Sequence, residues 1–518
     1  MYAGIFPDEL KIARVIPLFK SGDRNEMVNY RPISLLPVFS KIFEKLIHKR
    51  LMSFFDKHNV IYNKQFGFRK GHSTMHALNT AVTQVINSLN EKYSVFGVFL
   101  DFSKAFDTIK HDILLVKLEH YGIRGKFLDL MENYLDNRKQ LVFNGNIESD
   151  LLAISDGVPQ GSVLGPLLFL MYINDLIYSQ CSCNSNTCSS NCLDAASFVL
   201  FADDTNLFVK AKSVEEATAI INAVLKKIKA YLEANYLHIN IDKSKFIHFK
   251  SPRQNCDEIE YDIRFGDDPL KRVNWIKFLG VIIDERLSWT RHIRYVTNKV
   301  RNSIISLYDM RKVIPKKMKA SVYNALVNSQ LTYAIAVWGG NATGDRLKPL
   351  FTLQKRALRN LYGLKRVSKH VKAHTKPVFK ENGILTVYNL YNYMTILEIG
   401  KLKYNYTPKF LCDTLKIHEI TPRNKYGNRI HVPKLLCNHY QNNFCYQAPK
   451  LWNLLDSSHS YCGNATNSGN ILILKKKVKS FLLKMQSYHD DINWITANYR
   501  ISTYLAAIKN DPEVNTII

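Results

Sequence analysis

The sequence is poor in acidic residues relative to basic ones. It has 44 Asp and Glu residues against 71 Lys and Arg residues, a formal net charge of +27 at pH 7. A globular chain with such an excess of positive charge usually binds a polyanion, most often nucleic acid; an anionic membrane surface and a merely soluble exterior are the alternatives. The excess is concentrated between Arg291 and Lys380, where 20 basic residues accompany two acidic ones, a net of +18.

The sequence also lacks long apolar runs. None approaches the roughly 20 residues that a membrane-spanning helix needs, and the first residues have neither the basic nor the apolar region of a signal peptide. We therefore expect an intracellular protein, in the nucleus or the cytoplasm, that does not cross a membrane and keeps its nine cysteines reduced. A length of 518 residues with 46% hydrophobic residues suits about two to four folded domains.

The spacing of apolar residues predicts a mixed α+β protein up to about residue 290. Helices are expected after Pro37 and after Pro166, and over 76–89, 113–119, 127–135 and 214–232. Strands are expected over 95–101, 197–202, 206–209 and 237–249, with a hairpin around Asn144-Gly145. The basic segment 291–375 has helical spacing, whereas 376–518 shows too little periodicity to predict its elements.

Three aspartates follow apolar strands at points where the chain turns. Asp101 ends one strand, and Asp203 and Asp204 separate two others. An Asp-Asp pair alone is more often a solvated turn. Between two apolar strands, however, the pair lies at a hairpin tip near the core, where unpaired charge costs several kcal/mol unless it binds metal. Converging carboxylates can hold two Mg²⁺ ions, or Mn²⁺ instead, in the arrangement that promotes phosphoryl transfer.

Seven segments stand in an order that resembles the successive motifs of reverse transcriptases from non-LTR (LINE-type) retrotransposons, in particular jockey-like elements. They are Tyr30–Leu35, Gln65–Thr74, Phe99–Asp107, Gly157–Pro166, Phe201–Thr205, Asn240–Ser244 and Phe278–Gly280. The resemblance implies a right-hand polymerase fold, with fingers and palm in 1–290, a helical basic thumb in 291–375, and a C-terminal region, 376–518, whose fold is not assigned.

The resemblance also implies roles for individual residues. Asp101, Asp203 and Asp204 are expected to be catalytic and to bind the metals, while Phe106 fills the space of a ribose 2′-hydroxyl and so selects dNTPs. The other expected substrate contacts are Gln160 (nucleotide and template), Gly161 (close backbone approach to the ligand), Lys20 and Arg31 (triphosphate), Arg69 (triphosphate or template) and Lys243 (protonation of pyrophosphate).

In the basic segment, Gln354–Arg359 resembles the helix that follows the polymerase motifs in this family. Lys355, Arg356 and Arg359 are expected to contact the template–primer backbone without reading its sequence. Phe106, Arg69 and Lys243 each have a plain structural alternative, as a core ring, a surface charge and an exposed turn lysine.

The predicted function is that of an RNA-directed DNA polymerase of a mobile element, which adds dNTPs to a DNA primer on an RNA template. The alternative is a catalytically silent nucleic-acid-binding scaffold or relic derived from such an element. The intact carboxylates, with Phe106 and Gln160, favour the enzyme, because a scaffold does not need all of them.

Two features depart from the family pattern. Only about 30 residues precede Tyr30, so we expect a truncated copy without the N-terminal endonuclease, which a longer polyprotein would supply. Four cysteines, Cys181, Cys183, Cys188 and Cys192, lie in a Ser- and Asn-rich stretch. They are compatible with a zinc loop, but the spacing does not form paired Cys-x-x-Cys knuckles, which favours a flexible loop.

Overall fold

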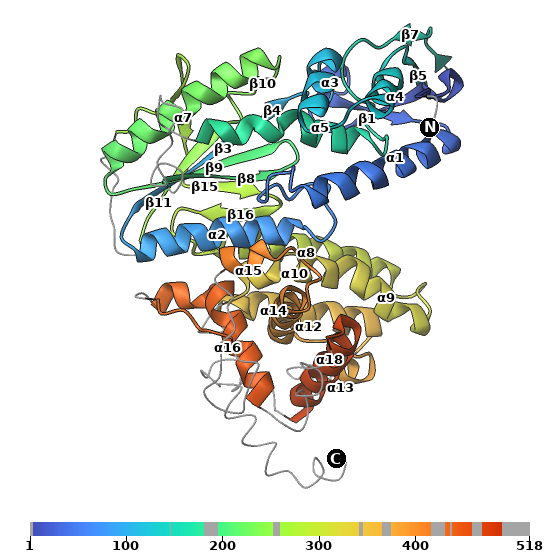
Figure 1. Cartoon of the computed structure of the whole chain (residues 1–518). Coiled ribbons are helices and arrows are strands. Elements are labelled where there is room, and N and C mark those ends of the chain that lie inside the picture. Colours follow the sequence, from blue (N-terminus) through green and yellow to red (C-terminus); the bar gives the residue numbers. More distant parts are fainter. Residues whose placement is uncertain are drawn as a thin grey trace. The chain divides into compact units, whose positions relative to one another are not determined.

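Figure 1 shows the computed structural model of the chain, which describes residues 4–145, 147–180, 195–251, 260–340, 345–364, 374–415, 430–435, 438–457 and 469–488. The contacts within the chain divide it into two compact units. The first unit comprises Met1–Lys70, Tyr93–His248 and Cys256–Val273, and the second comprises Gly71–Lys92, Phe249–Asn255 and Asn274–Ile518.

The first unit is built around a five-stranded sheet with the order β14-β11-β3-β9-β8. The strands are β3 (Ser94–Leu100), β8 (Ala196–Phe201), β9 (Asp204–Ala211), β11 (Lys245–Phe249) and β14 (Lys271–Arg272). Strand β3, with the sequence Ser-Val-Phe-Gly-Val-Phe-Leu, is buried from its second residue to its last, as expected for a strand covered on both faces. It pairs antiparallel with β9, and β9 pairs antiparallel with β8.

Helices of the first unit share one hydrophobic core with this sheet. Eight of the nine residues of α5 are buried, and α7 is capped at its N-terminus by Ser213, whose side chain accepts a hydrogen bond from the Glu216 N–H at 3.1 Å. The core-forming helices are α1 (Val38–Lys57), α3 (His111–His120), α4 (Lys126–Leu135), α5 (Gly165–Ile173) and α7 (Val214–Ala234).

A second sheet of the first unit has the order β2-β1-β5-β6, with β7 also paired to β5. Its strands are β1 (Ile12–Phe19), β2 (Tyr30–Leu35), β5 (Lys139–Asn144), β6 (Ile147–Glu148) and β7 (Leu152–Ala153). Smaller pairs are formed by β4 (Phe102–Ser103) with β10 (His238–Ile239), and by β12 (Arg264–Phe265) with β13 (Asp268–Pro269).

The second unit is mainly helical, with one hairpin of β15 (Trp275–Phe278) and β16 (Val281–Asp284). Its helices are α2 (Thr74–Asn90), α8 (Thr290–Met310), α9 (Lys319–Tyr323), α10 (Ser329–Thr332), α11 (Ile335–Trp338), α12 (Lys348–Tyr362), α13 (Lys376–Glu381), α14 (Val387–Lys403), α15 (Phe410–Thr414), α16 (Phe444–Ser457) and α18 (Ile471–Tyr488). In the part of the chain that the structure describes, every helix is too short or too polar to cross a bilayer.

The expected α+β class is confirmed, and most predicted elements of the first 290 residues are present. One prediction was wrong: the strand expected over 237–249 is interrupted between β10 and β11. There the side chain of Asn240 accepts a hydrogen bond from the Lys243 N–H, and the Ser244 hydroxyl donates to the Asn240 carbonyl, so local bonds form a turn. The cysteine-rich segment that contains Cys181, Cys183, Cys188 and Cys192 lies outside the described residues.

Candidate active site

The three predicted catalytic aspartates lie at one end of the central sheet. Asp101 directly follows β3, Asp203 lies in the turn between β8 and β9, and Asp204 begins β9. The antiparallel register pairs Leu100 with Thr205. The next position along the two strands therefore sets Asp101 beside Asp204, so main-chain pairing alone brings residues about a hundred positions apart to the same edge.

The turn that carries Asp203 has an unusual backbone. Ala202 adopts φ = 55°, in the left-handed region that side chains other than glycine rarely occupy. The side-chain oxygen of Gln65 accepts hydrogen bonds from the N–H groups of Ala202, at 3.0 Å, and of Gly67, at 2.9 Å. A Cβ atom on Gly67 would lie 2.3 Å from the Ala202 nitrogen, so only glycine fits there. We call residues 201–204, together with the strands β8 and β9 on either side, the carboxylate hairpin.

Gln65 begins the Gln65–Thr74 motif, but the sequence alone assigned it no role. Its side chain is 2% exposed, and the segment around it pairs with β8 through two main-chain hydrogen bonds, Phe66 N–H to Leu200 O and Leu200 N–H to Lys64 O. Its place at the start of the Gln65–Thr74 motif was the only available signal. The structure shows that it supports the carboxylate hairpin from within.

The carboxylates of the hairpin carry shifted pKa values. Loss of water contact is the largest cause for both, although each side chain still reaches the surface, and repulsion by neighbouring carboxylates adds to it. The pKa of Asp204 is raised to about 6, with Asp203 and Asp101 as the repelling neighbours. The pKa of Asp203 is also raised, but a main-chain hydrogen bond, Arg31 and Lys20 oppose the shift.

Lys20 and Arg31, both expected near the triphosphate, lie in the first unit close enough to act on Asp203. Arg31 belongs to β2, opposite Leu18 of β1, and the N–H of Lys20 donates to the Asn29 carbonyl at 2.9 Å, so the pairing of β1 with β2 sets both cations at one end. Both side chains are exposed. Lys243 lies beside Asp101, with its Nζ 3.7 Å from Oδ2 of that carboxylate.

Phe106 and Gln160 approach each other through the chain segments that hold them. The half-buried Phe106 ring stacks on Phe169 with 4.6 Å between ring centroids, and its carbonyl accepts a hydrogen bond from the Val158 N–H at 2.9 Å. Gln160 is half-buried, and its carbonyl accepts from the Ser34 N–H at 2.7 Å. The turn that carries Gln160 is therefore bonded to β2 on one side and to the Phe106 segment on the other.

Gly161 has φ = 124°, and a Cβ atom there would lie 2.6 Å from the Ser34 carbonyl oxygen. The neighbour for which this glycine makes room is therefore the β2 backbone.

The remaining predicted residues lie elsewhere. Arg69 has its side chain turned inward, where Nη1 donates to the Tyr62 carbonyl at 2.9 Å and Nη2 lies 3.9 Å from Asp56. The guanidinium of Arg69 is therefore already bonded to other groups of this chain. Lys355, Arg356 and Arg359 lie on α12 in the second unit, which is called the helical unit from here on. Arg356 is exposed and the other two are half-buried.

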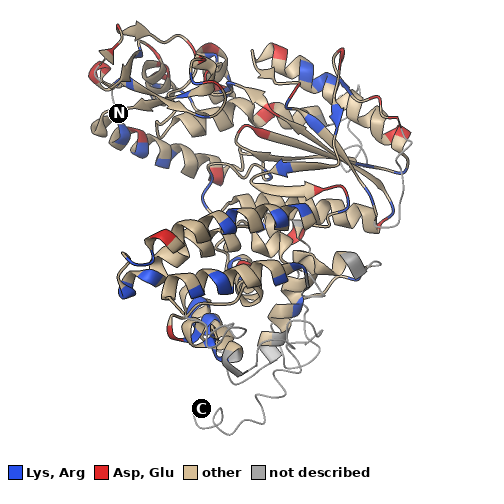
Figure 2. Cartoon of the chain, turned by 180° about the vertical axis from the view of Figure 1, so that it is seen from behind, with Lys and Arg blue, Asp and Glu red and all other residues tan. Residues whose placement is uncertain are grey.

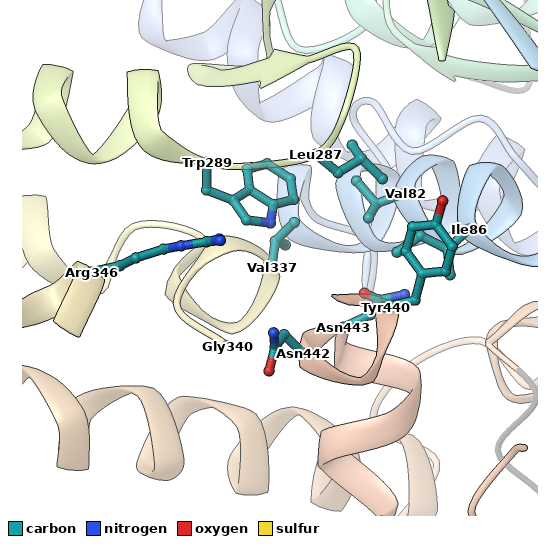
Figure 3. A pocket seen from close by; sticks show the side chains of 10 residues that line it. All are labelled: Val82, Ile86, Leu287, Trp289, Val337, Gly340, Arg346, Tyr440, Asn442 and Asn443. Atoms are coloured by element: carbon teal, nitrogen blue, oxygen red, sulfur yellow. The ribbon is translucent and has the colours of Figure 1, made fainter. Parts of the chain in front are cut away.

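The second, helical unit is rich in basic residues: Figure 2 shows lysine and arginine spread over several of its helices, with few acidic residues among them. It also contains a small pocket, lined among others by Trp289, Val337 and Arg346 (Figure 3). Arg346 donates to the Ser288 carbonyl at 2.8 Å. None of the ten described residues that line this pocket is acidic, so it offers no carboxylate for phosphoryl-transfer chemistry.

The three carboxylates have the right chemistry to bind a divalent cation, but their side chains are not gathered around a common point. Among the described residues, no three His, Cys, Asp or Glu side chains are gathered closely enough to ligate a metal ion. Carboxylate oxygens are nevertheless the ligands that Mg²⁺ prefers. Loss of water contact, followed by repulsion from neighbouring carboxylates, raises the pKa values of Asp203 and Asp204, and a bound cation would offset this cost of ionisation. Ligation requires side-chain movement around a backbone that already sets Asp101 beside Asp204.

Comparison with known proteins adds independent information. Residues 20–283 match the family model described as reverse transcriptase (RNA-dependent DNA polymerase). The chain is 29% identical over 366 residues to the RNA-directed DNA polymerase from mobile element jockey of Drosophila melanogaster. It is 27% identical over 362 residues to the probable RNA-directed DNA polymerase from transposon X-element of the same species.

These matches cover 70% and 69% of this chain but only 38% of each relative, so the chain spans well under half the length of both. Among solved structures, apo telomerase from Candida tropicalis is similar over 74% of this chain and 63% of that chain, with 11% identity and a TM-score of 0.40.

Proposed function

Because the chain belongs to the reverse transcriptase (RNA-dependent DNA polymerase) family, we propose that it copies RNA into DNA as the polymerase part of a non-LTR mobile element. Its substrates would be an RNA template, a DNA primer and dNTPs. The observation that carries the proposal is the set of Asp101, Asp203 and Asp204 at one end of a buried sheet, where loss of water contact and repulsion by neighbouring carboxylates raise the pKa values of the last two. A structural role alone gives no reason to retain that repulsion.

In this proposal the three aspartates supply the negative oxygen ligands of the site. Two Mg²⁺ ions held there, or Mn²⁺ in their place, would activate the primer 3′-hydroxyl and neutralise the leaving pyrophosphate. Lys20 and Arg31, whose charges already act on Asp203, would attract the triphosphate. Lys243, 3.7 Å from Asp101, is the candidate proton donor to pyrophosphate.

The nucleotide itself would contact Phe106 and Gln160. The Phe106 ring, supported by Phe169, would exclude a ribose 2′-hydroxyl, and Gln160 would position the nucleotide and template. Arg69 contributes less to substrate binding, because main-chain carbonyls already occupy its guanidinium.

We further assign fingers and palm to residues 1–290, a thumb to 291–375, and a separate C-terminal region to 376–518. The charge of +18 between Arg291 and Lys380 and the helices α8 and α12 support a thumb that holds the nucleic-acid backbone. The segment 71–92 and the residues from Asn274 onward group with the helical unit by contact, so α2 and the β15–β16 hairpin pack with the proposed thumb helices.

A primer-extension assay tests the proposed function. The purified chain is supplied with poly(rA) annealed to labelled oligo(dT), dTTP and Mg²⁺, and products are resolved by length. We expect extension that requires template, dTTP and Mg²⁺. Binding of the template–primer without extension under any of several Mg²⁺ and Mn²⁺ concentrations would contradict the proposal and leave the silent scaffold.

A further inference from the structure

The loop after β4 and the turn that carries Gln160 are joined by main-chain hydrogen bonds. The N–H groups of Gly157 and Val158 donate to the carbonyls of Ile109 and Phe106, at 2.8 and 2.9 Å. A Cβ atom on Gly157 would lie 2.9 Å from the carbonyl oxygen of Asp107, so the two segments are in direct backbone contact. This close packing fixes the distance between Asp107 and Gln160.

One side-chain contact crosses the same junction. The amide Nε2 of Gln160 donates a hydrogen bond of 2.9 Å to Oδ1 of Asp107, and both side chains are half-buried. An ionised carboxylate only accepts hydrogen bonds, so it must face the NH₂ end of the amide. Asp107 therefore determines which way the amide of Gln160 points and leaves its oxygen and second N–H for another partner.

The electrostatics of Asp107 agree with such a coupling. Burial raises the pKa of the Asp107 carboxyl, and the hydrogen bond from Gln160 and the charge of Lys104 oppose that rise. The amide thus stabilises the ionised carboxylate, while the carboxylate fixes the amide.

We propose that Asp107 is a positioning residue for nucleotide binding, which acts by holding the Gln160 amide in one orientation. The inference rests on the proposed polymerase function and on the nucleotide-contacting role of Gln160 within it. Without Asp107 the Gln160 side chain can adopt several rotamers, each with either orientation of its amide, and few of these arrangements suit the nucleotide. An incoming nucleotide must then select one of them, which weakens its binding before it affects chemistry.

Single-nucleotide extension with graded substitutions measures this effect. Asp107→Ala is expected to raise the KM for the dNTP by about tenfold, the size of one hydrogen bond to a charged group, and to change kcat by less than about threefold. Asp107→Asn should raise KM by a smaller factor, because its oxygen can still accept from Gln160 but its own amide can turn.

A double-mutant cycle separates this role from a general structural one. If Asp107 acts through Gln160, then adding Asp107→Ala to a Gln160→Ala chain should produce no further change in KM. The matched control is Asp156→Asn, which removes a carboxylate that pairs with Lys110 at 2.9 Å across the same two segments but does not contact Gln160. It should leave KM near the wild-type value.

The outcomes distinguish this inference from the proposed function. A normal KM in Asp107→Ala, additive effects in the cycle, or an equal rise in KM for Asp156→Asn would overturn the positioning role while polymerase activity stands. Circular dichroism and thermal melting of each variant identify a folding defect. If Asp107→Ala does not fold, the KM of Asp107→Asn, which is nearly identical in shape to wild type, decides instead, and a wild-type KM in that variant would overturn the positioning role. A wild-type chain without extension activity would overturn both proposals together.

Discussion

The side-chain oxygen of Gln65 lies 3.0 Å from the main-chain nitrogen of Ala202, a residue 137 positions further along the chain, and accepts its hydrogen bond. Ala202 is in the left-handed conformation, which costs an L-residue about 1–2 kcal/mol. The Gln65 contact offsets part of that cost. The conformation of the carboxylate hairpin thus depends on a distant loop.

We expect Gln65→Ala to impair both stability and catalysis. The substitution leaves the buried N–H of Ala202 without its partner, which should lower the free energy of unfolding by about 1–3 kcal/mol. It should also lower primer extension at least about tenfold, because the turn that presents Asp203 loses its support. Urea denaturation and extension assays measure the two effects. Gln140→Ala, at a half-buried position of β5, is the control; equal activity in the two variants would refute the supporting role.

We expect Asp204→Asn to stabilise the fold while it inactivates the enzyme. The pKa of Asp204 is raised from 3.8 to about 6, so the folded state is destabilised when this carboxyl ionises. The penalty is absent below pH 3.8, grows as pH rises toward 6 and is complete above it. Asp204→Asn should therefore raise Tm by roughly 1–2 °C at pH 8, a small value because the side chain reaches solvent.

The pH dependence provides the internal control for that prediction. The difference in Tm between Asp204→Asn and wild type should shrink as pH falls from 6 toward 4. A variant that melts below wild type at pH 8 would show that the carboxylate is held by favourable contacts rather than by repulsion.

We expect Phe106→Ala to weaken discrimination against ribonucleotides. Removal of the ring opens the space that a 2′-hydroxyl needs, so the ratio of rNTP to dNTP incorporation should rise at least about tenfold. Competition between rUTP and dTTP in single-nucleotide extension gives this ratio. Phe127→Ala removes a half-buried ring on α4 as a control for lost packing. An unchanged ratio in Phe106→Ala would make Phe106 a core residue of the Phe169 stack.

We expect the cations of α12 to bind the template–primer through its phosphates. Replacement of Lys355, Arg356 and Arg359 by Gln should reduce the slope of log affinity against log salt by about two to three, since each phosphate contact contributes roughly 0.7–0.9. Products should also become shorter, while the nucleotide KM stays unchanged. Fluorescence anisotropy from low to moderate salt measures the slope.

A charge-matched variant separates a specific role of α12 from the overall charge. Replacement of Lys475, Lys476 and Lys477 on α18 by Gln removes the same charge from another helix of the helical unit. Equal slopes for the two triple variants would mean that α12 has no special part in holding nucleic acid.

Local patterns predicted the elements that present the candidate site. The apolar run before Asp101 and the two runs around Asp203-Asp204 have few alternatives to buried strands, and they form β3, β8 and β9. The order of the motifs identified the family, which the match over residues 20–283 confirms. The side-chain roles assigned within those motifs remain predictions.

Features that depend on tertiary contacts were not predictable in this way. The contact of Gln65 with Ala202 and the inward turn of Arg69 involve partners that sequence spacing does not reveal. Helix α14 was missed for a different reason. Its buried residues include six in succession, Thr395–Gly400, so it is surrounded within its unit and lacks the apolar stripe that marks a surface helix.

The measurement that tests the central claim most directly is primer extension by Asp203→Asn beside Asp267→Asn. Asp267 begins a second Asp-Asp pair, which follows Phe265-Gly266 at the exposed β12–β13 turn, so the control makes the same change in a similar local sequence. We expect Asp203→Asn to lose at least about a thousandfold in extension rate and still to bind template–primer, while Asp267→Asn retains wild-type activity. Extension by Asp203→Asn within tenfold of wild type would contradict the assignment of these carboxylates as the catalytic site.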